Sequence, residues 1–129
     1  MLIRINELVI AINDDLVSHM MKEERILFPY VKELTAAEKD PQSLKSVGFG
    51  TVRNPIHMME MEHETVGALL EKTRELSHNY RLPEDACASY SLLYRMLDEF
   101  EDDLHIHIHL ENNILFPKAI ALEQKLRPE

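Results

Sequence analysis

The chain has 129 residues, 45% hydrophobic and 29% charged, as in an ordinary soluble protein, so residues 1–129 are expected to form one domain. Its net charge of −9, from 14 Lys and Arg against 23 Asp and Glu, argues against nucleic acid or an anionic membrane as partner. The single cysteine, Cys87, excludes a disulfide framework. No apolar run reaches the roughly 18 residues of a membrane span. The expected location is therefore the cytoplasm.

The first predicted helix covers residues 2 to 34, because apolar residues recur there at intervals of three and four. Pro29 lies inside this pattern and removes a backbone donor, so the helix is expected to kink or end early there. The inward face carries His19 and Glu23 together with Ile5, Leu8, Ile12, Leu16, Ile26 or Leu27, and Tyr30.

Residues 35 to 54 are predicted to form a loop, because proline and glycine interrupt the periodicity there. A second helix is expected to begin at Asn54-Pro55, with Asn54 as its N-cap, and to end between residues 77 and 79. Its inward face carries Ile56, Met59, His63, Val66, Leu70 and Thr73.

A third helix is predicted from residue 83 or 84 to residue 122, and Pro117 again predicts a kink or an early end. Its inward face is expected to hold Tyr90, Leu93, Leu97, Phe100, Leu104, His107, Glu111, Ile114 or Leu115, Lys118 and Leu122. Three long antiparallel helices make up most of a bundle, so the predicted fold class is all-α.

One pattern occurs twice in the chain. Residues 19–29 read HMMKEERILFP and residues 107–117 read HIHLENNILFP, so both have the form H-x-x-x-E-x-x-I-L-F-P. A His and a Glu four residues apart share one face of a helix, and a single such pair is usually a surface pair. Two copies, with a histidine on the inward face of the second helix, predict a shared metal site made of His19, Glu23, His63, His107 and Glu111.

Two ionised glutamates in one core layer must be neutralised, since buried Glu is rare unless it is paired or bound to metal. The predicted inward faces offer no arginine, and Lys118 lies about two turns beyond Glu111, so a metal ion is the simplest solution. Imidazole and carboxylate ligands without thiolate favour iron, manganese or zinc over magnesium or calcium. Carboxylates on facing helices can also bridge two metal ions.

Other residues of interest have simpler interpretations. The histidines His57, His105 and His109 lie off the predicted site, and the acidic run 98–103 is expected to be mostly a solvated face. Cys87 is expected to be a small apolar residue without a role at the site. Packing, rather than metal ligation, is expected of Met20, Met21, Met58, Met59 and Met61.

Along these segments the sequence resembles the hemerythrin-like, or HHE, family of di-iron four-helix bundles, and within it the bacterial proteins for repair of iron centres. The matching segments are SHMMKEERILFP (18–29), MEMEHETVGALL (59–70), PEDACASY (83–90) and HIHLENNILFPKA (107–119). The resemblance implies that Glu23 and Glu111 bridge two irons and that His19, His63 and His107 are terminal ligands.

The resemblance also implies a role in restoring iron–sulfur clusters damaged by nitric oxide or oxidative stress, by supplying iron to iron–sulfur proteins as clients. An alternative is a module that binds or senses oxygen or nitric oxide without turnover. A third reading is a degenerate structural protein that holds one metal ion, a different metal such as zinc or manganese, or none.

Two features of the family are missing from this sequence. One is a small N-terminal domain with adjacent cysteines, and the other is a preceding bundle helix that brings a further histidine ligand. The resemblance therefore predicts a bundle whose fourth helix is missing or supplied by a partner chain. Because three helices of four leave an apolar groove exposed, a homo-oligomer is expected, and exchange of helices is one way to form it.

Overall fold

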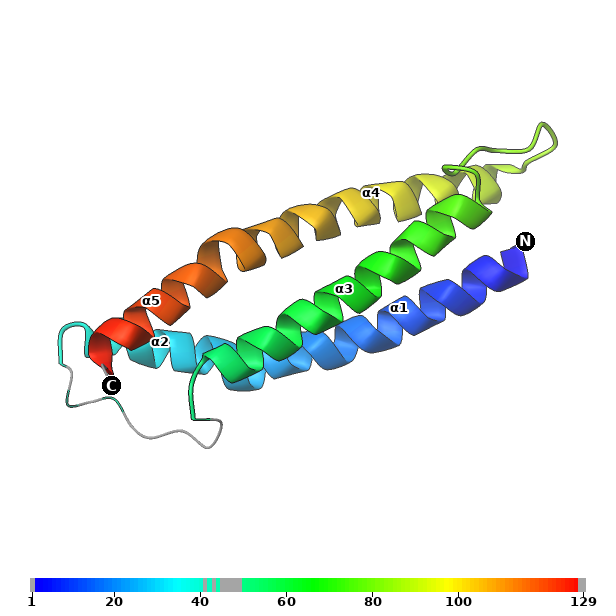
Figure 1. Ribbon diagram of the computed structural model, residues 1–129. Helices are drawn as coiled ribbons and strands as arrows, with labels where there is room; N and C mark the ends of the chain where they lie inside the picture. Colours follow the sequence, from blue (N-terminus) through cyan, green and yellow to red (C-terminus); the bar gives the residue numbers. More distant parts are fainter. Residues whose placement is uncertain (1, 41, 43, 45–49, 128–129) are drawn as a thin grey trace.

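The computed structural model describes residues 2–40, 42, 44 and 50–127, and these form three long helical rods without a strand (Figure 1). The first rod joins α1 (Leu2–Lys22), η1 (Glu23–Leu27) and α2 (Phe28–Ala37). The second is α3 (Arg53–Leu76), and the third joins α4 (Ala88–Leu110), η3 (Glu111–Leu115) and α5 (Phe116–Leu126). The all-α prediction is confirmed. Part of the predicted loop, at residues 41, 43 and 45–49, lies outside the described residues.

The two prolines do not end their helices, so the expectation of an early end is wrong. Each proline follows a five-residue π-helix and stands in the first turn of the next α-helix, where a missing N–H costs least. The Phe28 N–H donates to the Glu23 carbonyl, and the Phe116 N–H donates to the Glu111 carbonyl. In each rod, the change in helix geometry before the proline is thus confined to one wide π-helical turn. Each of these two turns begins at the glutamate of the repeated pattern.

Two helix starts differ from the sequence prediction. Helix α3 is preceded by Val52 rather than capped by Asn54, because the Val52 N–H donates to the Glu123 carboxylate at 2.8 Å. Helix α4 begins at Ala88 and not near residue 83, since the Ala86 N–H donates to the Pro83 carbonyl in a turn. Tertiary and turn hydrogen bonds therefore decide both boundaries.

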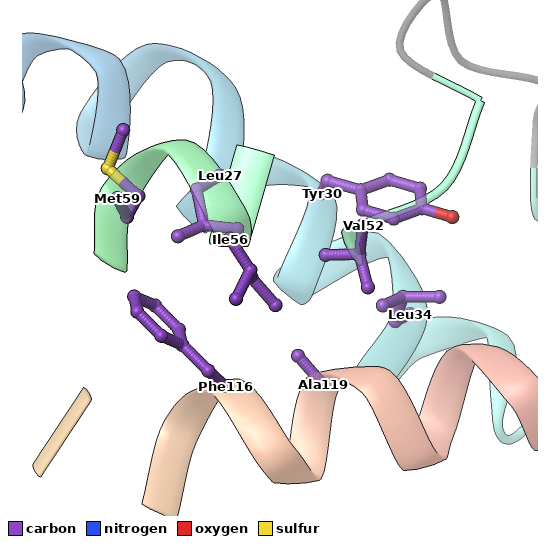
Figure 2. Close-up of a cluster of buried hydrophobic side chains, with 8 residues drawn as sticks. All are labelled: Leu27, Tyr30, Leu34, Val52, Ile56, Met59, Phe116 and Ala119. Atoms are coloured by element: carbon purple, nitrogen blue, oxygen red, sulfur yellow. The ribbon is translucent and has the colours of Figure 1, made fainter. Parts of the chain in front are cut away.

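The rods lie side by side, with α1 along α3 and α2 against α5 (Figure 1). Eight buried side chains fill the space among η1, α2, α5 and the start of α3 (Figure 2). They are Leu27, Tyr30, Leu34, Val52, Ile56, Met59, Phe116 and Ala119. A smaller cluster joins Ile12, Val66, Leu70 and Leu104. None of the described helices is long and apolar enough to cross a membrane.

Helix α3 buries the six residues that the sequence predicts for its inward face. The prediction is wrong for much of the third rod, where Leu93 and Phe100 are 41% and 40% exposed and Lys118 is exposed. Of the predicted residues, Leu104 and Glu111 are buried, and the rod also buries five residues that were not predicted: Tyr94, Glu101, Phe116, Ala119 and Glu123. Helix α4 therefore turns a different face toward α3 than its apolar periodicity suggests.

Glu101 explains part of this rotation. It is the buried member of the acidic run 98–103, in which Glu99, Asp102 and Asp103 are exposed, as expected of a mostly solvated face. The Arg74 guanidinium donates to the buried Glu101 carboxylate at 2.6 and 2.9 Å and to Asp98 at 2.6 Å. Hydrogen bonds between charged groups are stronger than those between neutral groups. The contacts of Arg74 with Glu101 and Asp98 therefore attach α4 to the C-terminal end of α3.

A second buried carboxylate, Glu123 of α5, joins three elements at the opposite end of the molecule. It accepts hydrogen bonds from the Tyr30 hydroxyl at 2.7 Å, from the Thr51 hydroxyl, and from the Val52 N–H. Burial disfavours the carboxylate form, but these donors outweigh burial and hold the pKa of Glu123 below its ordinary 4.5.

We predict that Glu123→Gln destabilises the fold by about 1–3 kcal/mol, because the amide group brings a donor toward a site where all three partners donate. Since the folded-state pKa of Glu123 is depressed, its contribution to stability is present above 4.5 and is lost as the pH falls through the folded-state pKa. Thermal unfolding followed by circular dichroism from pH 7 to pH 3 measures both effects. The exposed Glu99→Gln is the control, and equal stability of the two variants would contradict this role.

Candidate metal centre

Four of the five predicted site residues meet in the interior, where the three rods come together. His19 lies on the last turn of α1, His63 in the middle of α3, and Glu23 and Glu111 begin the two π-helices. One ligand atom from each lies within 4.8 Å of every other, and all four residues are buried. The repeated pattern thus places both glutamates at one centre.

The fifth residue, His107, lies at the edge of this centre. Its Nε2 atom is 2.9 Å from the nearer Glu111 oxygen and 3.9 Å from a Glu23 oxygen. Its side chain is 39% exposed, against 6% or less for the other four. His107 is therefore the member of the site that solvent reaches.

All three imidazoles turn Nε2 toward the centre. His19 Nε2 is 2.7 Å from a Glu23 oxygen, and His63 Nε2 is 3.0 Å from a Glu111 oxygen. The Nε2 atoms of His19 and His63 are themselves only 3.1 Å apart. Nitrogens and carboxylate oxygens so close together form a concentrated set of donors for a metal.

The opposite ring nitrogens are held by two residues that the sequence reasoning did not select. His19 Nδ1 lies 2.9 Å from Glu62, which also accepts from Lys22 at 2.6 Å, and His63 Nδ1 lies 2.9 Å from the Asn112 side-chain oxygen. An Nδ1–H donated outward leaves the Nε2 lone pair free to bind a metal. In the sequence, Glu62 directly precedes the predicted ligand His63, and Asn112 directly follows the predicted ligand Glu111. This adjacency is the only sign in the sequence that could have pointed to their role.

The polar atoms of the centre fit a cation. In the described part of the chain, both carboxylate groups, of Glu23 and Glu111, and His107 Nε2 are buried without a partner in hydrogen-bond geometry. With the Nδ1–H groups of His19 and His63 directed outward, the Nε2 atoms of these two rings and the facing carboxylate oxygens are all acceptors. A metal ion satisfies such an arrangement, which otherwise requires a proton.

In the metal-free protein, the electrostatics favour a proton on His19. Burial opposes a charged imidazole, but the carboxylates of Glu111, Glu23 and Glu62 outweigh it and raise the pKa of His19 to about 10. Burial, together with the neighbouring Glu111, raises the pKa of Glu23. Burial also acts to raise the pKa of Glu111, but His19 and His63 lower it well below its usual range. The centre therefore already attracts positive charge.

A largely apolar cavity of about 360 Å³ adjoins the centre between α1, α3 and α4. Its apolar lining includes Leu16, Val66, Phe100 and Leu104, and all three site histidines also line it. On another side, the Phe116 ring stacks on the ring of His63, with centroids 6.0 Å apart. Apolar surroundings strengthen the attraction between a cation and its carboxylate ligands.

The structure places the remaining histidines and Cys87 away from the centre. The four remaining histidines, His57, His78, His105 and His109, are exposed, and His109 contacts only Asn113 among the hydrogen bonds described for it. Cys87 is exposed just before α4. Met59 packs in the core as expected, but the packing prediction is wrong for Met20, Met21, Met58 and Met61, which are 39–51% exposed.

Comparison with known proteins agrees with this geometry. The family model described as the hemerythrin HHE cation binding domain matches residues 2–119. The chain belongs to the hemerythrin HHE family. The predicted resemblance is thereby confirmed, and the His and Glu cluster makes this hemerythrin-like chain a metal-binding domain.

Two similar proteins are named for a function in iron-sulfur cluster repair. The iron-sulfur cluster repair protein YtfE of Dickeya chrysanthemi is 43% identical over 113 residues, covering 87% of this chain and 45% of that protein. The protein of the same name from Cronobacter sakazakii is 40% identical over 114 residues, covering 88% of this chain and 45% of its own length. The hemerythrin-like chain thus spans less than half the length of these relatives.

We predict that Glu62→Ala weakens metal binding about 10- to 100-fold, because His19 loses the group that fixes its ring orientation. Glu62→Gln keeps an acceptor and should lose less. Competition with a coloured chelator gives the affinities. Glu64→Ala, at an exposed position two residues further along α3, is the matched control. Equal affinity of the Glu62→Ala and Glu64→Ala variants would refute the orienting role.

Proposed function

We propose that this domain holds two iron ions and serves, in the cytoplasm, in the repair of iron–sulfur clusters damaged by nitric oxide or oxidative stress, as an iron donor. In this proposal Glu23 and Glu111 bridge the ions, while His19, His63 and His107 are terminal ligands. The observation that carries it is the meeting of two buried carboxylate groups, whose oxygens lack a partner in hydrogen-bond geometry, with three inward-facing Nε2 atoms. The names of the longer relatives support the repair role.

The donor set fits iron, and the iron-sulfur names of the relatives favour iron among the metals that the set can bind. Mixed imidazole and carboxylate ligands suit iron, manganese and zinc, whereas structural zinc sites use four ligands, commonly with cysteine. Two carboxylates and three imidazoles around one centre suit a carboxylate-bridged pair of ions on facing helices. Zinc or manganese remain substitutes that the same residues can bind.

The protein residues would hold and release the metal ions. Glu62 and Asn112 orient two of the imidazoles, and the apolar cavity limits the access of water. Bound iron would supply redox chemistry. His107 is the most exposed ligand, so the path for an ion that leaves the centre runs past its ring.

Reversible binding of oxygen or nitric oxide without turnover is the alternative function. The cavity of about 360 Å³ beside the centre favours it, because a small apolar gas molecule fits such a space. Stoichiometric gas binding without loss of iron would support this alternative over iron donation.

We predict that the purified chain contains about two irons and transfers iron to an iron–sulfur protein whose cluster nitric oxide has destroyed. Return of the visible absorption of the cluster measures the transfer, with inorganic sulfide and a thiol reductant supplied and a chelator present to capture free iron. His107→Ala should change its rate strongly, whereas His109→Ala, on the exposed face of the same helix, should not. Zinc alone, no bound metal, or retention of all iron in the presence of the damaged client would contradict the proposal.

A further inference from the structure

Two carboxylate side chains, those of Glu62 and Asp103, belong to the described lining of the cavity beside the metal centre. Glu62 already has His19 and Lys22 as partners. Asp103 of α4 is exposed, and its carboxylate has no ion pair or hydrogen bond with another described residue. An unengaged carboxylate therefore stands where the apolar cavity meets the solvent.

Asp103 stands four residues before His107 on α4, so the two side chains share one face of the helix, one turn apart. The His and the Glu of the repeated pattern have the same spacing. In those pairs the Nε2 atom and a carboxylate oxygen lie 2.7 Å apart in one copy and 2.9 Å apart in the other. His107 thus has a carboxylate one turn away on either side, Glu111 toward the centre and Asp103 toward the solvent.

The repeated pattern extends further toward the N-terminus than its metal ligands. Residues 14–29 read DDLVSHMMKEERILFP and residues 102–117 read DDLHIHIHLENNILFP, so Asp15 corresponds to Asp103. Asp15 is exposed but does not line the cavity, and the side chain of His19, four residues later, is only 3% exposed. The second copy, in which the side chain of His107 is 39% exposed, therefore connects the solvent with the centre.

The centre behind His107 gives an independent indication that this connection serves a cation. The Glu111 side chain is 5% exposed, its nearer oxygen lies 2.9 Å from His107 Nε2, and both of its oxygens lack a partner in hydrogen-bond geometry. A buried carboxylate without such a partner requires positive charge. Because a bare ion is also costly to move through an apolar cavity, it must keep protein ligands along the way.

We propose that Asp103 and His107 form a transfer site, at which an Fe²⁺ ion stops on its way into and out of the centre. This rests on the proposed function, since the centre is taken to bind and release iron. On entry, the Glu111 carboxylate replaces that of Asp103 while His107 stays bound, and on exit the exchange is reversed. The ion remains Fe²⁺ throughout, so no oxidant or reductant is required.

A transfer ligand differs in its effects from a residue that only orients His107. Glu62 and Asn112 orient the other two imidazoles through Nδ1, and loss of such a group lowers the equilibrium affinity for metal. A transfer ligand holds the ion on the route but not in the final bound state. Its loss therefore slows uptake and release by the same factor and leaves the dissociation constant unchanged.

Stopped-flow kinetics of the purified chain, kept free of oxygen, test the proposal. Uptake of Fe²⁺ by the metal-free chain and release of Fe²⁺ to an excess of a coloured chelator are measured separately. Equilibrium competition with the same chelator gives the dissociation constant. Asp103→Asn should slow uptake and release alike by about 10-fold, because both pass through the step that it removes. The dissociation constant should stay that of the wild type.

Asp102→Asn is the matched control, because Asp102 is the exposed neighbour on α4, does not line the cavity and loses the same charge. Both of its rates should equal those of the wild type. Asp103→Glu keeps a carboxylate at the transfer site and should recover most of both rates.

Unchanged rates in Asp103→Asn would overturn the proposal, and so would an equal slowing by Asp102→Asn, which would indicate general attraction by the acidic surface. Weaker binding with faster release would also overturn it, because that result indicates orientation of His107. A chain that binds no iron contradicts both this proposal and the proposed function. A chain with the expected rates that rebuilds no damaged cluster contradicts the proposed function alone.

Discussion

Two carboxylates that face one another inside a helical bundle impose the main constraint on this structure. Glu23 and Glu111 are buried, and two such charges are costly to bury unless positive charge accompanies them. The three Nε2 atoms, the outward hydrogen bonds of His19 and His63, and the apolar lining all surround this one pair. The buried clusters on either side of the centre hold the three rods close enough for the pair to meet.

The repeated H-x-x-x-E-x-x-I-L-F-P pattern has a local explanation in the structure. The His lies in the last turn of an α-helix, the Glu begins a π-helix, and the Pro lies in the first turn of the next α-helix, where no N–H is needed. The two copies nevertheless pack differently. Leu27 is buried and Phe28 half-buried in the first, whereas Leu115 is half-buried and Phe116 buried in the second. The same residues therefore form the same backbone turn in both copies, but different side chains of the two copies are buried.

The sequence predicted the features that depend on one helix. The inward face of α3 was predicted completely, and the repeat placed both glutamates at one centre. Features that depend on contacts between rods were missed. Arg74 draws Glu101 into the interior, Glu123 sets the start of α3, and Glu62 and Asn112 orient two histidines from neighbouring helices. The periodicity of the apolar residues carries no information about such contacts. A charged residue is therefore predicted to face solvent unless its partner on another helix is known.

The central claim is that the five side chains around this carboxylate pair bind two iron ions. Anomalous diffraction from crystals of the purified protein, with data collected on both sides of the iron absorption edge, tests it most directly. The claim predicts two anomalous peaks between Glu23 and Glu111, within bonding distance of His19, His63 and His107. A single peak, a peak at another metal's edge, or no peak among these side chains would contradict it.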